Sequence, residues 1–72
     1  MISLAQRIIQ LQEQHGVNNL ELAKAVGVHR ITVMRWRNGS NMKVSDCAAL
    51  AQFFSISLEG LFKDVDGNVL ED

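Results

Sequence analysis

The chain has 72 residues, 47% of them hydrophobic and 21% charged, with no proline and a formal net charge of -1. This length and composition predict one small, compact domain and argue against a disordered chain. The sequence lacks both an apolar run of about 18 residues and a basic start followed by an apolar stretch, so we expect no membrane span, no secretory leader and a location in the cytosol.

The first predicted helix begins with a capping box. Ser3 is followed by Gln6, an arrangement in which each side chain can bond a free backbone N–H of the other residue. Apolar residues then recur at helical spacing, with glutamines between them. The pattern predicts a helix over residues 4–15 that ends at Gly16.

A second and a third helix are predicted close together. Asn18 and Glu21 repeat the capping pattern before residues 19–26, and Gly27 ends that segment because glycine readily adopts the left-handed conformation. A further periodic segment covers residues 30–38. Two short helices joined by so tight a turn must cross at a steep angle.

The second half of the chain predicts a polar loop, two more helices and a tail. After the loop at 39–43, the apolar face of a fourth helix repeats over Val44, Cys47, Ala48, Ala51 and Phe54. Ser57 can cap a fifth helix over 58–62. The acidic residues 64–72 predict either two short extended pieces joined by a turn at 65–69 or a solvated tail.

The two short helices in the middle meet the requirements of a helix-turn-helix. Small Ala23 lets the helices cross closely, Gly27 makes the turn, and Val28 fills its inner side. Val33 and Trp36 repeat at i, i+3 and predict the inner face of the second helix. Trp36 is therefore expected in the core and not as a platform for stacking bases.

Basic residues gather in the same segment. Residues 22–45 hold five of the seven basic residues and no acid, whereas residues 46–72 carry a net charge of -5. A local basic patch favours binding to polyanionic DNA even in a chain that is acidic as a whole. The five basic residues are Lys24, Arg30, Arg35, Arg37 and Lys43.

Residues 4–62 resemble the Cro/cI (lambda repressor-like) family of phage repressors and its bacterial relatives, through the stretches LELAKAVGV, VMRWRNG and ALAQFFSISLEGLF. The resemblance implies an all-α, five-helix bundle over residues 1–63, followed by a tail or dimerisation arm at 64–72. It further implies a transcriptional regulator, similar in size to a Cro repressor, that binds a palindromic operator in double-stranded DNA through the major groove. The implied setting is a phage, a prophage or a bacterial chromosome.

The resemblance also assigns roles to single residues. It implies phosphate contacts for Asn19, Asn38 and Lys43. The resemblance also implies that five residues enter the major groove, namely His29, Arg30, Ile31, Thr32 and Arg35. Helical geometry independently places Arg35 and Ile31 opposite Trp36, where arginine can read guanine and isoleucine a thymine methyl. His29 has two open interpretations, a phosphate contact or a residue that simply begins the helix.

Arg37 departs from the family pattern. The family often has a glutamate at this position, bonded to an arginine of the first helix, but the first-helix position here is Gln12. We predict that Arg37 reaches a DNA phosphate, with the acidic tail as the alternative partner. Met42 stands where the family often has proline.

One short helix reads only a few base pairs, so we expect a homodimer with half-sites about 34 Å apart. Val65, Val69 and Leu70 could add an extended arm to a dimer surface formed by the last helices. A solvated tail is the alternative.

Other functions remain open within and outside this fold. A restriction-modification controller or an antitoxin would share the DNA-binding helices, whereas an anti-regulator would bind protein and no DNA. We do not expect an enzyme, because the sequence shows no pairing of a nucleophile with a base, no glycine-rich phosphate loop and no pair of acids. The sequence implies no cofactor, metal, membrane partner or small-molecule ligand, and Cys47 is expected to be a buried, unreactive thiol.

Overall fold

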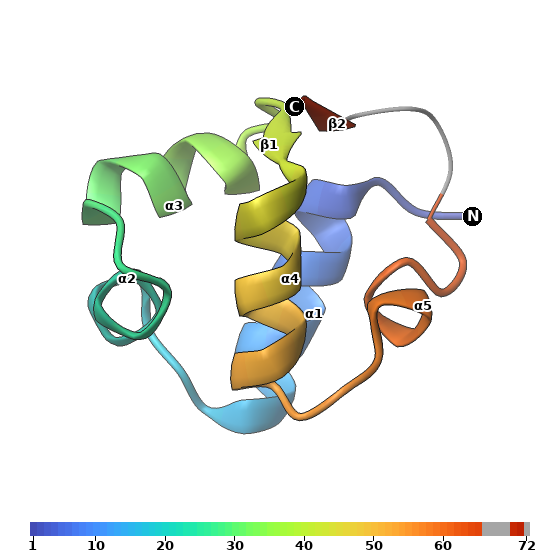
Figure 1. The fold of residues 1–72 in the computed structure, drawn as a ribbon, viewed down its shortest axis with the longest axis horizontal. Coiled ribbons are helices and arrows are strands. Elements are labelled where there is room, and N and C mark those ends of the chain that lie inside the picture. The colour runs from blue at the N-terminus through green and yellow to red at the C-terminus, as the bar shows by residue number, and fades with distance from the viewer. Residues whose placement is uncertain (66–69, 72) are drawn as a thin grey trace.

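The computed structural model describes residues 1–65 and 70–71 and has the all-α, five-helix architecture predicted from the sequence (Figure 1). Two strands of two residues each accompany the helices. The elements in chain order are α1 (Leu4–His15), α2 (Asn19–Val26), α3 (Arg30–Arg37), β1 (Met42–Lys43), α4 (Val44–Phe53), α5 (Leu58–Leu61) and β2 (Leu70–Glu71).

Both predicted capping boxes form. The Ser3 hydroxyl accepts the Gln6 backbone N–H at 3.1 Å, and the Gln6 side chain accepts the Ser3 N–H at 2.9 Å. Asn18 and Glu21 exchange the same pair of bonds at the start of α2. These bonds satisfy N–H groups that a helix leaves free at its beginning, which is why α1 and α2 begin where the sequence predicts.

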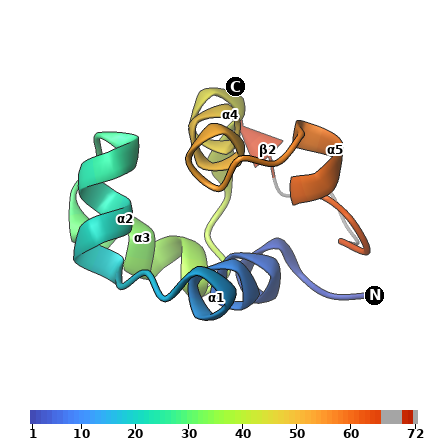
Figure 2. The same cartoon turned by 90° about the horizontal axis from the view of Figure 1, so that it is seen from below.

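The helices surround one apolar core. α1 and α4 lie at the centre of the molecule, with α2 and α3 on one side and α5 on the other (Figures 1 and 2). Every helix contributes buried side chains, among them Ile8, Leu22, Val33, Leu50 and Leu61, each with 0% exposure. None of the described helices is long and apolar enough to cross a membrane.

The buried face of α4 differs from the predicted one. Val44 is 39% exposed and Ala48 is exposed as well. The stripe that faces the core is instead Cys47, Leu50, Ala51 and Phe54. Cys47, Ala51 and Phe54 thus face the core as predicted, and the prediction was wrong at Val44 and Ala48. The i, i+3, i+4, i+7 spacing of the buried residues places Val44 and Ala48 towards the solvent side.

The segment predicted as a polar loop contains a core residue. Met42 is only 1% exposed and lies in β1, which pairs in parallel with β2 through the Met42–Leu70 and Lys43–Glu71 registers. Gly39, at φ 97°, turns the chain after α3 so that it can enter the core. The loop prediction was therefore wrong at Met42.

The beginning of the chain pairs with the segment that follows α5. The Ile2 backbone N–H donates to the Asp64 carbonyl at 2.8 Å, and Ile2 and Val65 form a parallel bridge. The rest of the predicted turn, residues 66–69, lies outside the described residues. Arg7 of α1 adds a further link because its Nη2 donates to the Gly60 carbonyl of α5 at 2.8 Å.

Candidate nucleic-acid interface

The connection between α2 and α3 has the geometry of a helix-turn-helix. Gly27 has a left-handed φ of 86°, and its N–H donates to the Ala23 carbonyl at 2.9 Å. The Val28 N–H donates to the same carbonyl at 3.0 Å, and its side chain packs against the core. Ala23 is only 2% exposed, so the small side chain lies in the packed interior beside the turn.

The two faces of α3 have different environments. Val33 and Trp36 are buried at 0% and 3% exposure. Thr32, in the first turn, is half-buried. The opposite face is exposed and carries Arg30, Ile31, Met34 and Arg35. The core therefore holds one side of α3 while the other side is free to meet a ligand.

His29 caps α3. Its imidazole Nδ1 accepts the Ile31 backbone N–H at 3.1 Å, and its carbonyl accepts the Thr32 N–H at 2.9 Å. The side chain is exposed, and the cap uses only Nδ1 of its two ring nitrogens. His29 thus has a structural role at the start of the helix, and its phosphate contact stays a prediction.

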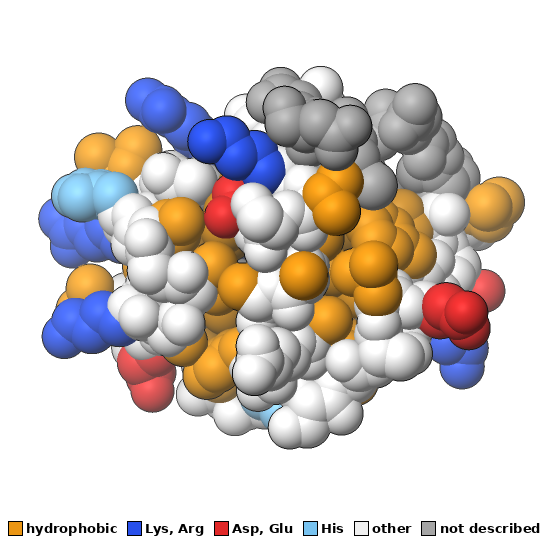
Figure 3. All heavy atoms as spheres, in the orientation of Figure 1, with side chains coloured by type: hydrophobic (Ala, Val, Ile, Leu, Met, Phe, Trp, Pro, Cys, Tyr) orange, Lys and Arg blue, Asp and Glu red, His pale blue; other side chains and the backbone are white. Residues whose placement is uncertain are grey.

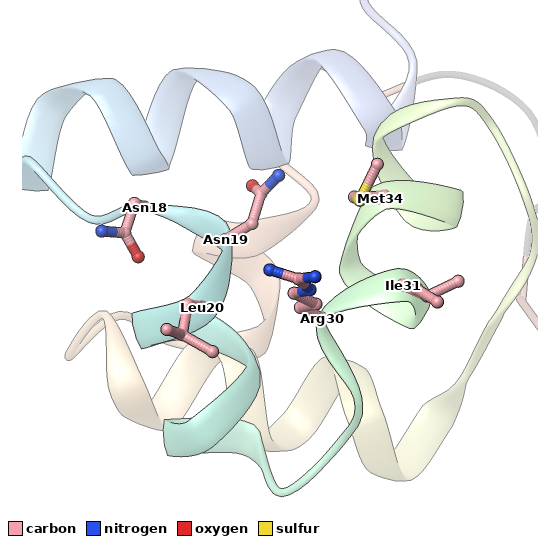
Figure 4. A pocket seen from close by; sticks show the side chains of 6 residues that line it. All are labelled: Asn18, Asn19, Leu20, Arg30, Ile31 and Met34. Carbon is pink, nitrogen blue, oxygen red and sulfur yellow. The ribbon is translucent and has the colours of Figure 1, made fainter.

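A groove of about 610 Å³ separates the beginning of α2 from the outer face of α3 (Figure 4). It is lined by Asn18, Asn19, Leu20, Arg30, Ile31 and Met34. Sequence reasoning had selected Asn19, Arg30 and Ile31 but missed Asn18 and Leu20. Leu20, Ile31 and Met34 are each 48% exposed, so Met34 belongs to an apolar group and is not an isolated exposed residue. The i, i+3 spacing of Ile31 and Met34 was the signal that could have found it.

Arg37 bonds to a residue that was not among its predicted partners, which were a DNA phosphate and the acidic tail. Its Nη1 donates to the Gln12 side-chain oxygen, which joins the end of α3 to α1. Gln12 is 3% exposed, and its Nε2 donates to the Asn19 Oδ1 at 2.9 Å and to the Val17 carbonyl at 3.4 Å. A neutral carboxamide thus accepts from the guanidinium without an ion pair.

The segment after α3 presents two further polar side chains. Asn38 ends α3 and is exposed. Lys43 is exposed and precedes α4 without making a side-chain cap bond. The first N–H groups of α4 therefore receive no hydrogen bond from the Lys43 side chain.

Charge on the described surface is unevenly distributed. Figure 3 shows Lys and Arg side chains gathered at the edge of the molecule formed by α2 and α3. Residues 22–45 contain no acid, and Glu21, in the first turn of α2, is the one carboxylate of these two helices. An anionic surface would be attracted to this side of the molecule first.

The residues predicted for dimerisation contact their own chain where they are described. Val65 is half-buried and packs against the core. The Leu70 backbone pairs with Met42, and Val69 lies outside the described residues. In the described parts of the chain, no three His, Cys, Asp or Glu side chains gather as a metal site would require.

Comparison with known proteins shows a likeness of fold. No family model matches the chain. A search of curated proteins also finds no similar sequence. The solved structure of a transcriptional regulator from Listeria innocua is similar with a TM-score of 0.77 and 24% identity, over 92% of this chain and 63% of that one. The chain therefore spans less than two thirds of that regulator, and at this identity the two share a fold.

Proposed function

We propose that the chain is a sequence-specific DNA-binding transcriptional regulator, a Cro-like repressor that binds a palindromic operator as a homodimer. The observation that carries the proposal is the division of α3 into two faces. Val33 and Trp36 anchor the helix in the core while Arg30, Ile31 and Arg35 remain exposed. A helix held in this way can enter the major groove with its outer side chains directed at base edges.

The exposed face has the chemistry for reading bases. Arg30 and Arg35 can each make two parallel hydrogen bonds to O6 and N7 of guanine. Ile31, which is 48% exposed, can contact the methyl group of thymine. Thr32 is half-buried in the first turn, so its methyl group is the least accessible of the four proposed base-reading groups.

The surrounding polar groups suit the phosphate backbone. Asn38 and Lys43 follow α3, Asn19 begins α2, and His29 begins α3. Such contacts set the register of the protein on the duplex without reading its sequence. Arg37 remains a candidate for the same role because Gln12 occupies one of its five N–H donors.

Dimerisation is proposed through the end of the molecule that carries α5. Phe53 and Leu58 are large apolar residues with 39% and 43% exposure, and a second copy could bury them. We further propose that Val65, Val69 and Leu70 add an extended arm to the pairing surface of the last helices. Two α3 helices would then meet successive major grooves in a bacterial or phage operator.

The test is the selection of binding sites from a random DNA pool, followed by titration of the best site at two salt concentrations. We expect an enriched palindrome and an affinity that falls at least roughly tenfold between about 50 and 200 mM salt. Sedimentation at the same concentrations should show a dimer. A chain that enriches no sequence and has no salt-dependent affinity would instead support a protein-binding anti-regulator.

A further inference from the structure

We propose that Gln12 and Arg37 are positioning residues that hold the Asn19 carboxamide with its nitrogen facing a DNA phosphate. The inference rests on the proposed function, since it concerns how one backbone contact of that surface is prepared before DNA binds. The three residues form a hydrogen-bonded chain from α3 through α1 to α2. They are separated in the sequence by 25 and 7 positions.

The direction of the hydrogen bonds from Arg37 through Gln12 to Asn19 follows from the chemistry of the guanidinium group. A guanidinium has only donors, so the Gln12 atom that faces Arg37 must be the carbonyl oxygen. The other end of the Gln12 carboxamide is then the NH₂ group, which donates to Asn19 Oδ1 at 2.9 Å. With Oδ1 turned inward, the Asn19 NH₂ group is directed away from Gln12.

Burial prevents Gln12 from reversing freely. Its side chain is 3% exposed, and Nε2 also donates to the Val17 carbonyl at 3.4 Å. A reversed carboxamide would place NH₂ against the Arg37 guanidinium and an oxygen against two acceptors. Unpaired polar groups of this kind are costly in a buried site, so the observed orientation is held.

Asn19 lies where a phosphate would approach. It is half-buried at the first position of α2 and lines the groove with Arg30 and Met34 (Figure 4). Among the described residues, its Nδ2 has no hydrogen-bond partner. A free NH₂ donor at the beginning of a helix faces an anion favourably, whereas a carbonyl oxygen there would repel it.

The wild-type protein allows a direct test by NMR. We expect the side-chain amide protons of Gln12 to be protected from solvent exchange in the free protein, while those of Asn19 exchange rapidly. Addition of a mixed-sequence duplex of about 20 base pairs should shift and protect the Asn19 amide protons. Protection of the Asn19 amide in the free protein, with Gln12 unprotected, would overturn the proposal.

The variant Gln12→Glu reverses the direction of the hydrogen bond between residues 12 and 19. In Gln12→Glu the carboxylate can still accept from Arg37, but it offers only acceptors to Asn19, whose NH₂ group must then turn inward. We expect affinity for the same duplex to fall roughly tenfold, as for loss of a charge-assisted bond. Thermal unfolding should show a folded protein, since the new carboxylate faces a guanidinium.

Two controls separate the effect of the Asn19 orientation from the effect of the added negative charge. Gln14→Glu adds the same charge to the exposed side of α1 and should weaken binding only about twofold. In an Asn19→Ala background, Gln12→Glu should cost no more than Gln14→Glu does. An equal cost of Gln12→Glu with and without Asn19 would overturn the positioning role while leaving DNA binding in place. A wild-type chain that binds no duplex would instead refute the proposed function.

Discussion

Arg35 illustrates how much of a single side chain's role follows from helical period. Val33 and Trp36 occupy the inward side of α3, so a residue between them in sequence points outward. Its exposure follows from that placement, and its proposed pairing with guanine follows from the guanidinium's two parallel donors.

We expect Arg35→Ala to weaken binding to the selected operator by about 1–3 kcal/mol while affinity for random DNA changes much less. Fluorescence anisotropy with both duplexes measures the difference. Lys63→Ala, which removes an exposed positive charge after α5, is the matched control and should affect both duplexes equally and weakly. Equal losses on the two duplexes for Arg35→Ala would rule out base reading by this residue.

Cys47 has the buried position expected from its apolar surroundings. It is 0% exposed, and burial, together with the charge of Asp46, raises the pKa of its thiol from 9.0 to about 11. The thiolate is the reactive form of cysteine, so the folded protein keeps Cys47 in the unreactive form at neutral pH.

The raised pKa of Cys47 predicts a loss of stability in alkali. Between pH 9 and about 11 the unfolded chain ionises its thiol while the folded chain keeps the proton, so the free energy of unfolding should fall as pH rises through this range. Urea titrations of the wild type and of Cys47→Ala at several pH values isolate the effect. If both proteins lost stability in parallel, the thiol would not be the cause.

Among the features of the helices, the sequence predicts their ends best. The bounds of α1 and α2 agree with the predicted ranges because their caps join residues three positions apart. The end of α4 differs from those of α1 and α2. Ser55 follows it at φ 57°, a left-handed conformation that is costly for a residue with a Cβ.

We expect Ser55→Gly to raise the free energy of unfolding by about 0.5–1 kcal/mol, because glycine adopts this conformation without strain. The matched variant is Gly27→Ala, since Gly27 occupies the equivalent place after α2 at φ 86°. No heavy atom beyond the adjacent residues lies within 4 Å of an added Cβ there, so backbone strain alone should cost about 1 kcal/mol. Chemical denaturation measures both, and shifts of the same sign would contradict the argument.

At the scale of the whole molecule, the core depends on a residue from outside the helices. Met42 enters the interior between α3 and α4 and is 1% exposed. The sequence around it, Ser40-Asn41-Met42-Lys43, is mostly polar and has no periodicity to indicate burial. Its position depends on contacts with elements far away in the chain.

Met42→Ala should therefore lower the free energy of unfolding by about 2–5 kcal/mol, as expected for removal of a buried methionine side chain. Met34→Ala, the same substitution at a residue that is 48% exposed, should change it by less than about 1 kcal/mol. Urea denaturation monitored by Trp36 fluorescence compares the two. Similar small effects would mean that Met42 contributes little to the core.

The sequence by itself determined the helices, the helix-turn-helix and the inward and outward faces of α3. Each of these depends on interactions between residues a few positions apart, such as the Ser3–Gln6 capping box or the Val33–Trp36 repeat. Local hydrogen bonds and helical period are legible in a single sequence because their partners are close neighbours in the chain.

Only the tertiary structure decided the burial of Met42, the pairing of Met42 with Leu70, and the chain from Arg37 through Gln12 to Asn19. These contacts join residues that lie on different elements, and packing of the whole core brings them together. The half-buried guanidinium of Arg37 takes the acceptor that the packing provides, and here that acceptor is a carboxamide on α1.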